Sequence, residues 1–190
     1  MYKELFKWVV AIITQPAKAW DELSRKKEKG DEHLNRFVYP LIGLVTAAAF
    51  VGILFTHKDF NIELALKSSI KALVSYFGGF FLAAYLLNEL WVAMFKREND
   101  IKLCQRFVGY SSAMIYSLNI VLMLLPASDF FFLRALMFVT VYIVWEGAAP
   151  YMKVPDKERL KFMIVASLLI ISLPQIIGFF LFMLMPGLRV

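Results

Sequence analysis

Residues 69–95 read SIKALVSYFGGFFLAAYLLNELWVAMF, and this stretch decides the fold class of the chain. From Ala72 to Phe95 it contains one ionisable residue, Glu89. A helix over these 24 residues would be about 36 Å long, which is enough to cross a bilayer with some tilt. The stretch therefore predicts a membrane-spanning helix, and the remaining segments must be arranged around it in lipid.

The composition of the whole chain agrees with this reading, because 60% of its residues are hydrophobic and they gather into runs between short charged connectors. Four further runs are long enough to span a bilayer: 37–56, 107–125, 130–149 and 162–185. With the span at 70–95, they predict an all-α polytopic membrane protein. We expect residues 37–190 to form a bundle of five transmembrane helices and residues 1–36 to form cytoplasmic amphipathic helices and a basic linker.

The first apolar segment, residues 2–13, is too short to cross a membrane. Lys3 and Lys7 would share one face of a helix there, and apolar side chains would cover much of the rest. A cleaved signal peptide is the rival interpretation, but the apolar run from Trp8 to Ile13 is shorter than the usual hydrophobic core of such a peptide. We therefore expect an interfacial amphipathic helix.

A second helix is expected to begin at Pro16, because proline is tolerated in a first turn, and to end in a basic run at 25–29. The run could be a solvated helix end, but a span begins a few residues later, which favours contact with anionic lipid headgroups. The expected lipid-contact residues are Trp8, Trp20, Arg25, Lys26, Lys27 and Lys29.

The distribution of lysine and arginine predicts the orientation of the chain. Sixteen of the 21 basic residues lie in residues 1–36, 96–106 and 153–161, which a five-span protein places on one side of the membrane. Basic residues gather on the cytoplasmic side of membrane proteins. We therefore expect a cytoplasmic N-terminus and an external C-terminus.

The chain lacks the common sequence signatures of catalysis. The chain has no phosphate-binding loop of the Gly-x-x-x-x-Gly-Lys type and no His-Glu-x-x-His zinc motif. Its two histidines, His33 and His57, are expected on opposite sides of the membrane. We therefore expect no enzyme activity and no catalytic, cofactor-binding or metal site. The net charge of +6 lies in juxtamembrane connectors, which indicates lipid headgroups rather than nucleic acid as the partner.

One group of polar residues within the spans is a candidate intramembrane site: Asn88, Glu89 and Asn119. Glu89 would lie about 9 Å along the helix from Phe95, below the membrane interface, so it must be neutral, paired or exposed to water. Two interpretations stay open. The group could be structural hydrogen bonding, or it could line the polar path of a small transporter or channel subunit.

The order of elements resembles a known family. Pro16 is followed by Trp20, then by a basic linker and five spans, the third of which opens with Gly109-Tyr110-Ser111. This arrangement is similar to the Yip family of Ypt/Rab-interacting polytopic membrane proteins. The Asp-Leu-Tyr-Gly-Pro motif of the eukaryotic members is missing, which favours the bacterial branch and the bacterial cytoplasmic (inner) membrane. The resemblance implies a non-enzymatic membrane organiser or adaptor with a possible protein partner in the membrane, since eukaryotic members act in vesicle trafficking and membrane shaping.

Overall fold

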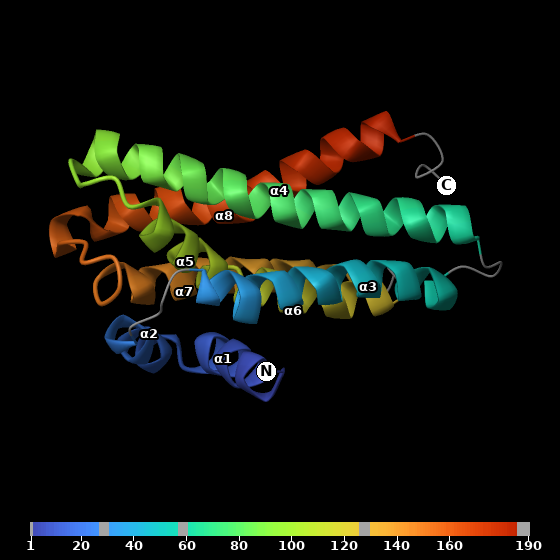
Figure 1. Ribbon diagram of the computed structural model, residues 1–190, viewed down its shortest axis with the longest axis horizontal. Helices are drawn as coiled ribbons and strands as arrows, with labels where there is room; N and C mark the ends of the chain where they lie inside the picture. The colour runs from blue at the N-terminus through green and yellow to red at the C-terminus, as the bar shows by residue number, and fades with distance from the viewer. Residues whose placement is uncertain (1, 27–30, 57–60, 126–129, 186–190) are drawn as a thin grey trace.

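The computed structural model describes residues 2–26, 31–56, 61–125 and 130–185, and every regular element in these ranges is helical (Figure 1). This confirms the predicted all-helical class. The α-helices are α1 (Tyr2–Thr14), α2 (Pro16–Arg25), α3 (Tyr39–Thr56), α4 (Ile62–Phe95), α5 (Ile101–Ser111), α6 (Ala113–Leu124), α7 (Val139–Ala148) and α8 (Asp156–Leu184). A π-helical turn, η1 (Leu34–Val38), precedes α3, and a 3₁₀ helix, η2 (Phe131–Phe138), precedes α7.

The long helices lie side by side along the long axis of the molecule, and α4 packs extensively against α8 (Figure 1). Their close approach depends on Gly79, where an added Cβ atom would come within 2.7 Å of the Pro174 ring on α8. Small residues allow helix backbones to approach in this way in lipid. The short helices α1 and α2 lie against the side of the bundle, near the end where α4 stops and α8 begins (Figure 1).

Helix α4 begins at Ile62, whereas the sequence predicted a span starting at residue 70 after a polar connector. The extra turns have local causes. The Asn61 side chain accepts a hydrogen bond from the backbone N–H of Leu64 at 3.1 Å and so caps the helix, and Glu63 pairs with Lys67 one turn later. With 34 residues, α4 is about 51 Å long, longer than a bilayer core.

The segment predicted as one span at 107–125 is divided between α5 and α6, which meet at Ser112 with a bend of 41°. The Ser112 hydroxyl donates a hydrogen bond to the Val108 carbonyl at 2.8 Å. A serine that binds the carbonyl one turn earlier competes with the backbone ladder and often bends the helix. The prediction of one regular helix missed this break.

The predicted number of five spans is not confirmed. Among the described residues, three helical segments are long and apolar enough to cross a membrane: 34–53, 62–95 and 156–184. The bent pair α5 and α6 makes a fourth if it is counted as one span. The predicted span at 130–149 is instead a 3₁₀ helix followed by the 10-residue α7, so neither helix alone has the length of a span.

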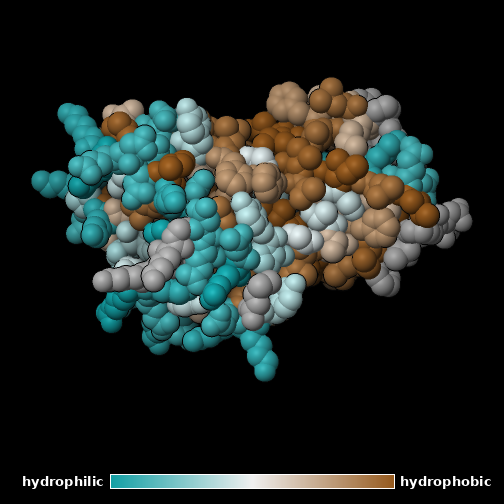
Figure 2. Space-filling model, viewed as in Figure 1, coloured by the Kyte–Doolittle hydropathy of each residue, from teal (hydrophilic) through white to brown (hydrophobic). Residues whose placement is uncertain are grey.

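Hydrophilic and hydrophobic residues occupy different parts of the surface (Figure 2). In this view a hydrophobic band lies between a large hydrophilic region, at the end that carries α1 and α2, and a smaller hydrophilic patch at the other end. Such a band is expected of a protein whose middle faces hydrocarbon. The molecule is therefore built as a membrane protein.

An aromatic cluster joins four helices at the hydrophilic end of the bundle. Trp20 of α2 stacks on Phe107 of α5, Phe107 contacts Phe162 of α8, and Phe162 contacts Trp91 and Phe95 of α4. The ring centroids in these pairs are 5.1 to 5.7 Å apart, within the range in which aromatic pairs stabilise a fold beyond area burial alone. This cluster connects the N-terminal helices to the core.

Candidate membrane-surface site on the N-terminal helices

Helix α1 has two distinct faces. Leu5, Val9 and Ile12 recur at helical spacing and are buried against the bundle. On the other side, Phe6 is 57% exposed and Val10 is 56% exposed. Because the protein already buries one apolar face of α1, these two outward side chains form a second apolar surface that has no partner within the described part of the chain.

Helix α2 is fixed to the bundle by Trp20, whose side chain is completely buried. Its indole N–H donates a hydrogen bond to the Ile143 carbonyl of α7 at 2.8 Å. Its ring stacks on Phe107 at a centroid distance of 5.1 Å and also contacts the rings of Tyr110 and Tyr151. A buried tryptophan with a satisfied N–H is a strong anchor, because large apolar area and a directional bond act together.

The fit of Trp20 requires a glycine on the neighbouring helix. A Cβ atom added at Gly147 of α7 would come within 2.5 Å of the indole ring, closer than real Cβ atoms approach other atoms. The ring occupies the space that a side chain would otherwise take. Trp20 and Gly147 therefore fix the position of α2 on α7.

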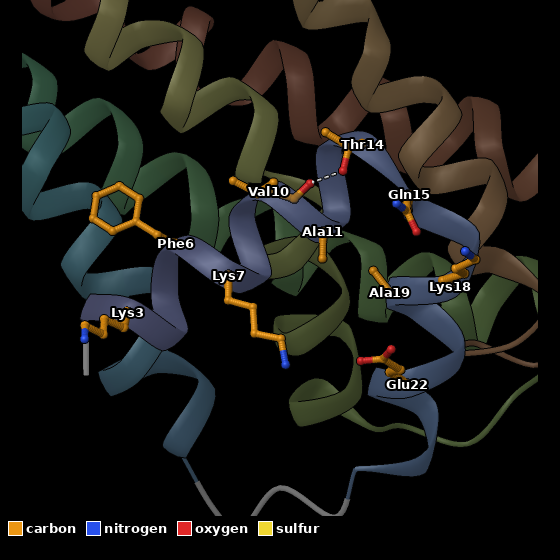
Figure 3. A pocket seen from close by; sticks show the side chains of 10 residues that line it. All are labelled: Lys3, Phe6, Lys7, Val10, Ala11, Thr14, Gln15, Lys18, Ala19 and Glu22. Atoms are coloured by element: carbon orange, nitrogen blue, oxygen red, sulfur yellow. Dashed lines mark hydrogen bonds between the residues drawn. The ribbon is translucent and has the colours of Figure 1, made fainter.

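A groove of about 490 Å³ lies between the outer faces of α1 and α2 (Figure 3). Lys7 of α1 and Glu22 of α2 extend toward the space between the two helices, while Phe6 lies farther along α1 (Figure 3). The lining residues are Lys3, Phe6, Lys7, Val10, Ala11, Thr14, Gln15, Lys18, Ala19 and Glu22. Three lysines beside exposed apolar side chains are the combination found on helices that lie in the membrane interface.

The other expected lipid-contact residues fall in different environments. Trp8 is half-buried, and the Lys26 ammonium lies 5.4 Å from its ring centroid, within the range of a cation–π interaction. Arg25 is exposed and pairs with Asp21 at 2.7 Å. Trp20 faces the protein interior, so its side chain packs against protein and not against lipid. Lys27 and Lys29 lie outside the described residues.

The candidate intramembrane residues on α4 have separate surroundings. Asn88 is buried, and its side-chain oxygen accepts a hydrogen bond from the Asp100 backbone N–H at 3.1 Å. Asp100 in turn caps α5 by accepting a hydrogen bond from the Leu103 N–H. Asn88 thus fixes the connection between α4 and α5, whereas its neighbour Glu89 is exposed on the surface of α4.

Asn119 lies at a different level of the bundle. Its amide N–H donates to the Ile115 carbonyl at 2.8 Å, and it lines a pocket beside Ser75 and Tyr76 of α4. Along α4, Ser75 is 13 residues from Asn88, or about 20 Å. The structure therefore does not bring Asn119 together with Asn88 and Glu89, and they do not assemble into one polar path.

Sequence reasoning missed the two structural features that best define the sites. Gly147 gave no signal of its own, because its role depends on a ring that is distant in sequence. Lys71 and Arg134 belong to separate helices, and no sequence pattern indicated that both line the pocket that contains Asn119. Within the described ranges, no three side chains of His, Cys, Asp or Glu come together as a possible metal site.

A family model described as Yip1 domain matches residues 10–185 of the chain. The match extends from the middle of α1 to the end of α8 and so covers nearly all of the elements described above. Comparison with curated proteins found no match. Comparison with solved structures found none either.

Proposed function

This chain belongs to the Yip1 domain family of membrane proteins, and from that premise we propose that it is a non-enzymatic membrane organiser or adaptor whose working surface is the outer face of α1 and α2. The single observation that supports this most strongly is the arrangement of α1 and α2, which together form an N-terminal layer on the bundle. Its inner face is fixed by the buried Trp20, and its outer face presents Phe6 and Val10.

Because α1 and α2 are attached rigidly, their outer face keeps a constant position on the bundle, which a flexible tail would not. Whatever α1 and α2 bind is held at a constant position relative to the bundle, because Trp20 contacts both α5 and α7. Apolar side chains that enter one leaflet from a fixed base displace lipid there and not in the other leaflet. This asymmetry supports a role in shaping or organising the membrane.

The partners we propose are anionic headgroups next to this layer and a protein partner in the membrane. Lys3, Lys7 and Lys18 supply cations beside the groove, and each basic residue near an anionic surface contributes about 1 kcal/mol. Arg25, Lys26, Lys27 and Lys29 would extend this basic surface along the chain. Trp8 would lie at headgroup level beside Lys26.

We also propose that five segments cross the membrane, with η2 and α7 together as the fourth. At 2.0 Å per residue in the 3₁₀ part and 1.5 Å in the α part, this pair would extend about 31 Å. Sixteen of the 21 basic residues would then lie on one side. This supports a cytoplasmic N-terminus and an external C-terminus. The missing Asp-Leu-Tyr-Gly-Pro motif supports a place in the bacterial cytoplasmic membrane.

Reconstitution into vesicles tests the proposed function. The full chain would be incorporated at a fixed protein-to-lipid ratio into vesicles that contain phosphatidylglycerol, and vesicle diameters would be measured by electron cryomicroscopy. We expect the wild-type protein to shift the distribution to smaller diameters than protein-free vesicles. The double variant Phe6→Ala/Val10→Ala should lose most of that shift, because it removes the two exposed apolar side chains of α1 and leaves its buried face intact.

A matched control is available elsewhere on the surface. Phe138→Ala/Val121→Ala also removes one phenylalanine and one valine that are exposed, outside the N-terminal layer, and should keep the wild-type distribution. Equal diameters for wild-type protein and Phe6→Ala/Val10→Ala would overturn the proposal. So would a wild-type protein that leaves the distribution of the protein-free vesicles unchanged.

A further inference from the structure

A second pocket, of about 510 Å³, is lined by the N-terminal half of α4 and the C-terminal half of α8, away from the end of the bundle where α4 stops and α8 begins (Figure 1). It is bounded by α4, α6, η2 and α8, and its volume is typical of sites that hold a small molecule. Two cationic side chains line it, Lys71 of α4 and Arg134 of η2. Residues from separate helices thus converge on one space.

Both cations are available to a ligand. The Lys71 ammonium lies 5.0 Å from the centroid of the Phe182 ring, a contact that leaves its hydrogen-bond donors free to turn into the pocket. No ion pair to Lys71 or Arg134 occurs within the ranges that the structure describes. Two uncompensated positive charges beside one pocket favour an anion with several acceptor oxygens, because such a group satisfies both.

A buried hydroxyl points to the same chemistry. Ser75 lines the pocket and is only 5% exposed, yet its hydroxyl has no hydrogen-bond partner in the described part of the chain. Buried polar groups are nearly always hydrogen-bonded, so an unpartnered one indicates a missing partner. The space beside it is kept open by Gly178 of α8, where a Cβ atom would lie 3.1 Å from the Ser75 oxygen and 3.8 Å from the Lys71 Cε atom.

The rest of the wall is mixed: Ser68, Asn119 and Gln175 contribute polar side chains, and one part of it is apolar. Phe179 and Phe182 of α8 line it together with Met123 of α6, and Phe179 is 56% exposed on the outer surface of the bundle. Hydrocarbon next to a cationic pocket suits an amphiphile better than a free ion, because the chain can lie along the phenylalanines while its charged group enters the pocket.

We propose that this pocket binds the phosphate-bearing headgroup of an acidic phospholipid from the leaflet opposite α1 and α2. Lys71 and Arg134 would donate hydrogen bonds to the phosphate oxygens, and the Ser75 hydroxyl would donate a third. The acyl chains would lie against Phe179 and Phe182. The same anionic chemistry could come from free phosphate, and the exposed apolar wall is the observation that assigns the site to a lipid.

Native mass spectrometry of the full chain in detergent tests this assignment. The purified protein would be titrated with phosphatidylglycerol and, in parallel, with zwitterionic phosphatidylcholine. We expect tighter binding of phosphatidylglycerol, and we expect its apparent Kd to rise at least about tenfold in Lys71→Gln/Arg134→Gln, since two charge-assisted hydrogen bonds are lost. Lys71→Gln alone should give a smaller increase, and it serves if the double variant does not fold.

Two control variants distinguish binding of the lipid at this pocket from attraction of the lipid by positive charge elsewhere on the protein. Lys67→Gln removes a cation one turn from Lys71 that already pairs with Glu63 and does not line the pocket, so its affinity should equal that of the wild type. Lys71→Arg keeps the charge and should retain binding.

Equal affinity for the two lipids, or wild-type affinity in Lys71→Gln/Arg134→Gln, would overturn the proposal. Displacement of phosphatidylglycerol by inorganic phosphate at equal concentration would also overturn it, because the ligand would then be the free anion.

Discussion

The indole ring of Trp20 lies against Gly147, so closely that a Cβ atom on that glycine would come within 2.5 Å of the ring. The two residues are 127 positions apart in sequence and belong to α2 and α7. Their fit holds the N-terminal layer on the bundle, and the proposed working surface depends on it.

Gly147→Ala should therefore destabilise the protein by about 1–3 kcal/mol, the usual cost of overpacking a filled site. The added methyl group must displace the Trp20 ring or move α2 away from α7. Thermal unfolding in detergent would measure the effect as a lower midpoint. Gly43→Ala is the matched control, because a Cβ atom there would meet nothing within 4 Å and alanine favours a helix over glycine, so its midpoint should not fall.

Trp20→Ala should release α2 from the bundle. The change removes a fully buried ring and leaves a cavity beside Phe107 and Tyr151, which costs about 3–5 kcal/mol for a residue of this size. Limited proteolysis would show faster cleavage within residues 1–36 than in the wild type. Trp20→Phe keeps most of the ring but loses the hydrogen bond to Ile143, so it should give an intermediate rate. Equal cleavage of wild-type and Trp20→Ala protein would contradict the anchoring role.

Asn88 and Glu89 are neighbours, but their substitution should affect stability to different extents. Asn88→Leu should lower stability by about 1–3 kcal/mol, because the Asp100 N–H loses its partner and the cap of α5 is disturbed. Glu89→Gln should leave the unfolding midpoint nearly unchanged, since its side chain is exposed. Loss of proton-linked flux in folded Glu89→Gln reconstituted in liposomes would support the transporter interpretation over the organiser.

The proposed five crossings predict which positions share one side of the membrane. Single cysteines at Ser24, Asn99 and Asp156, in a Cys104→Ala background, should be protected from a membrane-impermeant thiol reagent added outside intact cells. A cysteine at Asn61, at the opposite end of α4, should react. Labelling at Asn99 together with protection at Asn61 would reverse the orientation, and labelling at both positions would rule out α4 as a span.

The sequence was sufficient to predict an all-helical membrane protein, because apolar runs between basic connectors can satisfy their backbone in lipid only as helices. It was not sufficient for the irregular parts. The bend at Ser112 depends on a hydroxyl that binds the Val108 carbonyl, and the 3₁₀ helix η2 has the same composition as a regular span. Hydropathy does not distinguish these conformations.

The candidate sites were harder to predict for a related reason. Trp20 was interpreted as a lipid contact because tryptophans often lie at membrane interfaces, but the ring fills the space at Gly147, a long-range fit that no local pattern indicates. Asn119 was grouped with Glu89 because both lie in spans, yet they lie at different levels of the bundle. Which residues of different helices face one another across the bundle cannot be predicted from hydropathy.

The depth of Phe6 in the membrane tests the central claim most directly. A Phe6→Cys variant in the Cys104→Ala background would carry an environment-sensitive fluorophore in vesicles that contain phosphatidylglycerol, and lipids brominated at shallow depth would be the quenchers. The same label at Asn99, in the connection between α4 and α5, would be the solvent control. We predict blue-shifted emission and strong shallow quenching at position 6, with neither at position 99. Emission at position 6 equal to that at position 99, without quenching, would contradict the claim that the outer face of α1 and α2 lies in the membrane interface.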